Sequence, residues 1–139
     1  MATYTKFHAF VEHLAEKVHN LGADQLVVAL TNTAPTASSN TVRADLTEIS
    51  YTNCSTRNIT TSSSAQTSGT YKLVLTDLTL TASGGSVGPF RYVVIYNDTP
   101  TSPADPLIAY YDYGSSITLA DTEPLLIDFD GSAGLLQIA

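Results

Sequence analysis

Glu16 and His19 have the Glu-x-x-His spacing that di-iron sites in helical bundles use. Such a site draws its carboxylates and histidines from four facing helices, whereas this sequence predicts a single helix. We therefore interpret both residues, together with His8 and His13, as polar side chains on a solvated helix face.

Asp128 and Asp130 stand before Gly131 in a pattern that partly matches a calcium-binding loop. An EF-hand loop needs oxygen ligands at alternate positions and a closing glutamate, and the residues after Gly131 supply no such carboxylate. We predict an Asp-Gly turn at a strand end here. A surface ion shared with another aspartate is the alternative.

Nucleophilic catalysis has little support in this sequence. Cys54 is the only cysteine, which excludes an intrachain disulfide and a cysteine-rich zinc site. A Cys–His mechanism would also need an orienting group and an oxyanion site. No Gly-x-Ser-x-Gly elbow is present, and the glycines at 84–88 precede a strand and not a phosphate-binding helix. We expect a protein that is not an enzyme and has no cofactor or metal.

Tyrosines form the constellation that most suggests a function. Five of the eight fall on two neighbouring runs: Tyr92, Tyr96, Tyr110, Tyr111 and Tyr113. Tyrosine suits positions where its ring contacts apolar groups and its hydroxyl contacts water, and such positions are common at interfaces. Consecutive tyrosines on a strand point to opposite faces. An interface and a cross-strand tyrosine ladder are equally good interpretations.

An amphipathic helix is predicted over residues 4–21. Its apolar residues recur at spacings of three and four, Thr3 or Thr5 can cap its start, and Gly22 suits its end. The apolar stripe consists of Phe7, Phe10, Val11, Leu14, Val18 and Leu21.

Short strands separated by turn residues follow the helix. We predict seven or eight, a spacing typical of all-β sandwiches. They lie at 26–30, 71–75, 78–82, 90–96, 107–113, 117–120, 125–129 and 135–138. The run 90–96 is β-branched and aromatic almost throughout, as in a strand buried on both faces.

Three details refine this prediction. The Ser/Thr-rich segment 52–70 should be a mobile loop with one weak edge strand near 57–61. Apolar alternation changes phase at Thr76–Asp77, where we expect a break or bulge. Residues 130–134 should turn the chain into a final hairpin. The chain should form one domain over 1–139, with the helix at about 4–21 and the sandwich at about 24–139.

Charge excludes one class of partner. The net charge is −7, and the six basic residues are scattered along the chain, so we expect no nucleic-acid binding. The sequence has no apolar run of membrane-spanning length and nothing like a secretory signal, which predicts no membrane association and folding in a reducing cytoplasm.

Several segments together resemble the capsid cement, or decoration, proteins of tailed bacteriophages. They are Ala9–Glu12, Val28–Pro35, Ser68–Val74, Ser83–Tyr92, Tyr96–Thr99, Asp105–Ile108 and Asp112–Leu119. The resemblance covers nearly the whole chain and includes no catalytic motif. It implies a jelly-roll-like β-sandwich that is made in the host cytoplasm. It also implies a dimer or trimer that binds the major capsid protein on the outside of the virion and stabilises subunit junctions.

On this hypothesis the partner interface would lie on Arg91, Tyr110, Tyr111 and Tyr113, together with segment 52–70. The alternative is a receptor- or carbohydrate-binding module of a tail fibre or another tail component. Such a module would need exposed aromatic side chains with carboxylates nearby, and the lack of tryptophan argues mildly against it.

Overall fold

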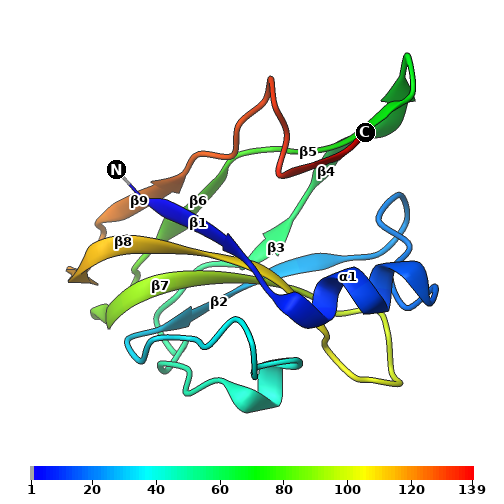
Figure 1. Ribbon diagram of the computed structural model, residues 1–139. Helices are drawn as coiled ribbons and strands as arrows, with labels where there is room; N and C mark the ends of the chain where they lie inside the picture. Colours follow the sequence, from blue (N-terminus) through cyan, green and yellow to red (C-terminus); the bar gives the residue numbers. More distant parts are fainter. Residues whose placement is uncertain (1) are drawn as a thin grey trace.

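The computed structural model describes residues 2–139 and is mainly β, with one α-helix near the N-terminus (Figure 1). The β-sandwich predicted from the sequence is therefore confirmed. In chain order the elements are β1 (Thr3–Lys6), α1 (His8–Ala15), β2 (Leu26–Thr31), the 3-10 turn η1 (Arg43–Asp45), β3 (Asn58–Ile59), β4 (Thr61–Thr67), β5 (Thr70–Leu75), β6 (Leu78–Thr81), β7 (Val87–Asn97), β8 (Leu107–Leu119), β9 (Pro124–Ile127) and β10 (Leu136–Ile138).

The strands form two layers. One layer is a single antiparallel sheet in the order β1-β8-β7-β2-β3. The other consists of two smaller antiparallel sheets, β10-β5-β4 and β6-β9. In Figure 1 the large sheet runs across the middle of the view, and β5, β6 and β9 lie above it. The two longest strands, β7 and β8, contribute side chains to both hydrophobic clusters of the core, which are described below.

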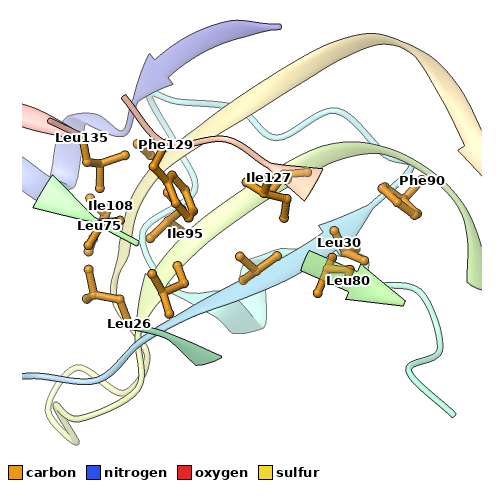
Figure 2. Close-up of a cluster of buried hydrophobic side chains, with 14 of the residues drawn as sticks. Leu26, Leu30, Leu75, Leu80, Phe90, Ile95, Ile108, Ile127, Phe129 and Leu135 are labelled. Atoms are coloured by element: carbon orange, nitrogen blue, oxygen red, sulfur yellow. The ribbon is translucent and has the colours of Figure 1, made fainter. Parts of the chain in front are cut away.

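The main core fills the space between the two layers. Figure 2 shows leucine, isoleucine and phenylalanine side chains from both layers, among them Leu30 and Ile95 of the large sheet and Leu75 and Leu80 opposite them. All four are at most 2% exposed. Burying one such side chain contributes about 1.5–3 kcal/mol, so this cluster is the main source of the fold's stability.

The large sheet is buried on its second face as well. Val94 and Tyr96 of β7 pack there with Val27 and Ala29 of β2, in a second cluster that also holds Phe7. The predicted double-sided burial of the 90–96 run is therefore confirmed. Such a strand cannot alternate polar and apolar residues, which explains its continuous β-branched and aromatic sequence.

A polar network holds the segment between β2 and β3 against the large sheet. The Tyr51 hydroxyl accepts a hydrogen bond from the Leu30 N–H (2.8 Å) and donates one to Glu48 Oε1 (2.6 Å). The Arg57 guanidinium stacks 3.7 Å from the centroid of the Tyr51 ring and donates to the Val28 carbonyl. Leu30 is fully buried, so its N–H depends on this hydroxyl.

The helix prediction was wrong in its extent. Residues 3–6 form β1, because their alternating Thr and Tyr side chains suit the free edge of β8, where Thr5 pairs with Tyr110. The cap position is Phe7, without a side-chain hydrogen bond, and not a threonine. The helix ends after Ala15, where Lys17 takes the left-handed backbone (φ 66°) expected of Gly22.

Other boundaries also differ from the prediction. Segment 52–70 supplies two strands, β3 and β4, and β4 forms a hairpin with β5 through Ser68 and Gly69, both at positive φ. The runs 107–113 and 117–120 are one strand, β8, which continues through Gly114 at φ 95°. The break at Thr76–Asp77 is confirmed, because β5 ends at Leu75 and β6 begins at Leu78.

The predicted C-terminal hairpin was also wrong. The turn at 130–134 leads into β10, but β10 pairs with β5 and not with β9. The turn itself lies against β5: Leu135 N donates to the Leu73 carbonyl, and a Cβ on Gly134 would lie 2.6 Å from that oxygen. This leaves one edge of β9 without the strand that the sequence suggested.

Replacing Tyr51 with phenylalanine should lower the free energy of unfolding by about 1–3 kcal/mol, because the buried Leu30 N–H loses its acceptor. Urea denaturation followed by circular dichroism measures the change. Tyr113→Phe is the matched control, since Tyr113 is 51% exposed and its hydroxyl can keep its bonds to water. Equal unfolding midpoints for the two variants would contradict the role assigned to this network.

Candidate functional site

A groove opens between the two layers where β8, together with Ala2 just before β1, faces β9. We call it the β8–β9 groove. It has a volume of about 840 Å³, within the range of ligand-binding clefts. Its lining is Ala2, Val93, Tyr111, Tyr113, Leu125, Leu126, Ile127, Asp128, Asp130, Gly131 and Ser132. Figure 1 shows β9 running beside β1 and β8 at this end of the molecule.

The groove exists because the layers are incompletely closed here. β1 pairs with β8 only from Ala109 to Asp112, so in the described residues the outer edge of β8 beyond Asp112 has no partner strand. β9 pairs only with β6 within residues 2–139. Tyr113 and Leu126 are consequently 51% and 57% exposed, so two large side chains from facing layers open to solvent at the same groove.

Aromatic packing fixes the floor of the groove. The Tyr111 ring is tilted against Tyr4, with centroids 5.5 Å apart, and against Phe129 at 6.4 Å. These arrangements are the favourable non-parallel geometry of aromatic pairs. Tyr111 is half-buried and packs against the main core that contains Phe129, so packing holds its ring in place. This packing restricts movement of the floor.

The mouth of the groove is acidic. Burial raises the pKa of Tyr111, and the nearby carboxylates of Asp130 and Asp128 raise it further. The N–H groups of Ala133 and Ser132 donate to Asp130 (2.8 Å each), which lowers its pKa and keeps it charged. The positive charge of Lys72 also lowers the pKa of Asp130, and Lys72 donates to the Ser132 carbonyl at 3.1 Å.

The structure separates the four residues predicted for the interface. Tyr111 and Tyr113 line the groove together. Tyr110 faces the second cluster, where its ring lies 5.2 Å from that of Phe7. Arg91 is held by Asp112 in a two-point ion pair of 2.7 and 2.9 Å. The alternation of side chains along β8 explains why neighbouring tyrosines divide between two faces.

The other predicted interface segment, 52–70, lies elsewhere. Its strand β4 is an edge of the β10-β5-β4 sheet, carries exposed serines and threonines, and does not line the groove. Sequence reasoning missed the β9 wall of the groove. One signal was present: a strand over 125–129 places Leu125 and Ile127 on one face and Leu126 on the other, so a sheet covered on one side exposes Leu126.

His8 and His13 lie on α1 and His19 follows it, and none of the three lines the groove. His19 is 6% exposed, so it is buried, whereas a solvated position was expected for it. Asn97 Nδ2 lies 3.1 Å from His19 Nδ1 and donates to Asp24 Oδ2 at 2.6 Å. The rings of His13 and His19 are 6.1 Å apart. Burial lowers the pKa of His19 to about 4, and His13 adds to the effect.

No metal site is formed by these or other side chains of residues 2–139, since no three His, Cys, Asp or Glu residues come together. Cys54 is half-buried, and burial raises the pKa of its thiol, which disfavours the reactive thiolate. In the described part of the chain, helices fall short of the length and apolar character that a membrane span requires. The chain matches no protein-family model, no curated protein and no solved structure.

Acid should destabilise the protein through His19. The unfolded chain takes up a proton on this histidine near pH 6.5 and the folded chain only near pH 4. The His19 contribution is therefore fully present above pH 6.5 and is lost as the pH falls to 4, by about 2–3 kcal/mol.

Urea denaturation at pH 7 and pH 4 of the native protein and of His19→Gln isolates this effect, because glutamine does not titrate and other groups contribute to both proteins. The native protein should lose more stability between the two pH values than the variant does. An equal loss would show that His19 titrates normally in the folded state.

Proposed function

We propose that the protein is a virion structural protein of the capsid cement type, which binds the outer surface of the major capsid shell and stabilises the junctions between capsid subunits. The observation that carries the proposal is the β8–β9 groove, with Tyr113 and Leu126 exposed over a rigid aromatic floor. The sequence resemblance to decoration proteins supplies the virion context.

The groove has the chemical features of a protein-docking surface. Interfaces are enriched in tyrosine and contain a buried, more apolar centre inside a polar rim. Here Tyr111, Leu125 and Ile127 supply the apolar centre, and Asp128 and Asp130 supply the rim. A rigid surface also loses little conformational entropy when it binds, which favours affinity.

Stabilisation of a shell follows from binding alone. A protein that binds the closed shell and not the separated subunits shifts the equilibrium toward the closed shell by its binding free energy. Icosahedral symmetry repeats the contact many times, and a dimer or trimer of the chain would engage neighbouring subunits together. Modest affinity at each groove is therefore sufficient. The acidic chain would favour basic patches on the capsid surface.

A second candidate has a specific observation in its favour. Tyr111 and Tyr113 lie in one groove with Asp128 and Asp130, and this combination of aromatic faces and carboxylates is what a carbohydrate-binding module of a tail component would need. Binding to a panel of bacterial surface glycans, without binding to capsid shells, would favour this candidate over the cement protein.

The cement proposal predicts saturable attachment to undecorated shells assembled from the major capsid protein that is encoded with this chain. Co-sedimentation should give a fixed ratio of bound chain to capsid subunit. Decorated shells should also disrupt at a higher temperature in a scanning fluorescence assay. No attachment at micromolar concentrations would contradict the proposal.

Groove variants should weaken this attachment. Tyr113→Ser and Leu126→Ser should each raise the dissociation constant about tenfold, because each removes exposed apolar surface of the groove. Val11→Ser is the matched control, since Val11 is 52% exposed on α1, outside the groove. An effect of the control equal to that of the groove variants would place the contact elsewhere.

A further inference from the structure

The free edge of β9 presents main-chain hydrogen-bonding groups that β6 does not use. Pairing of β9 with β6 places Leu125 opposite Leu80, Leu126 opposite Thr79 and Ile127 opposite Leu78. Just beyond the strands, the Ala82 N–H donates to the Glu123 carbonyl at 3.2 Å. Antiparallel strands alternate between residues that bond to the partner and residues that face away. Counting from Glu123, the N–H and C=O of Leu126 face away from β6.

The sheet that contains β9 is incomplete. Two-stranded sheets are marginal by themselves and gain stability from a third strand. Natural edge strands carry residues that prevent pairing with another strand, and β9 has only one of them: Pro124 lacks an N–H. The next residue that faces outward, Leu126, offers a main-chain N–H and C=O and an exposed apolar side chain. A third strand laid on this edge would lie inside the β8–β9 groove, since residues 125–128 line it.

Charge decides which kind of strand fits. Asp128 is exposed and, within residues 2–139, makes no ion pair, and both Asp128 and Asp130 act on the Tyr111 hydroxyl. A second copy of this chain would bring a net charge of −7 toward this acidic mouth. A segment with a lysine or arginine would instead neutralise it.

We infer that the β8–β9 groove takes an extended segment of the capsid partner, which adds as a strand to the free edge of β9. Alternate side chains of the segment are apolar and pack between Tyr111 and Leu125, and a lysine or arginine meets Asp128. Main-chain bonds give such a contact affinity, and alternate side-chain pockets give it specificity. This inference rests on the proposed function and specifies how the groove would bind.

Hydrogen–deuterium exchange with undecorated shells tests the inference. On binding, the amides of residues 125–130, Leu126 above all, should become protected from exchange. Attachment to shells without protection of this segment would overturn strand addition and leave the cement function intact. Absence of attachment would overturn both. Protection that grows with protein concentration without shells would identify a second copy as the occupant and overturn the inference.

Two substitutions at Leu126 separate strand pairing from simple apolar contact. Leu126→Ala keeps the outward N–H, whereas Leu126→Pro removes it and leaves the bonds to β6, because edge strands accept proline where the N–H faces out. Leu126→Pro should bind shells about tenfold more weakly than Leu126→Ala. Equal affinities of the two folded variants would overturn the inference; if Leu126→Pro does not fold, the exchange experiment decides.

Charge reversal tests the expected basic residue of the partner. Asp128→Lys should weaken attachment at low salt, and the difference from the native protein should shrink as salt is raised. Glu12→Lys changes the net charge equally at an exposed position on α1 and is the control. A loss of equal size in both variants would show that only overall charge matters and would overturn the pairing with Asp128.

Discussion

The pairing of β7 with β8 is the interaction on which the rest of the structure depends. Both strands carry apolar side chains on both faces, so the large sheet must be covered twice. The small sheets cover one face, and the segment from β2 to β3 covers the other with half-buried Leu46. The same segment also runs along β2, where Tyr51, which donates to Glu48, accepts from the Leu30 N–H, and Arg57 donates to the Val28 carbonyl.

The same pairing creates the groove. β8 extends past β1 along its outer edge: β1 pairs with it only as far as Asp112, whereas β8 continues to Leu119. On the opposite layer, β9 is short and its following turn leaves to join β5. The exposed tyrosine and leucine at this place are therefore a consequence of strand lengths. Large exposed apolar patches are rare on monomeric proteins and mark sites where a partner binds.

Much of the fold could be predicted from local pattern. The run at 90–96 indicated a central buried strand because nearly every residue is β-branched or aromatic, and the change of phase at Thr76–Asp77 located a break. Long-range pairing could not be predicted. The helix was predicted to begin at about residue 4, yet residues 3–6 form a strand because β8 offers them an edge. The chain after Asp130 looked like a hairpin, yet pairs with a strand about sixty residues earlier. For the same reason the sequence indicated Tyr111 and Tyr113 but not the β9 wall opposite them.

The central claim is that the β8–β9 groove is the surface that docks on the capsid. A cryo-electron microscopy reconstruction of shells decorated with this chain tests it most directly. The account predicts that the groove faces the shell and is filled by capsid density running alongside β9. A reconstruction in which the groove opens to solvent, with α1 or the β4–β5 hairpin touching the shell instead, would contradict it.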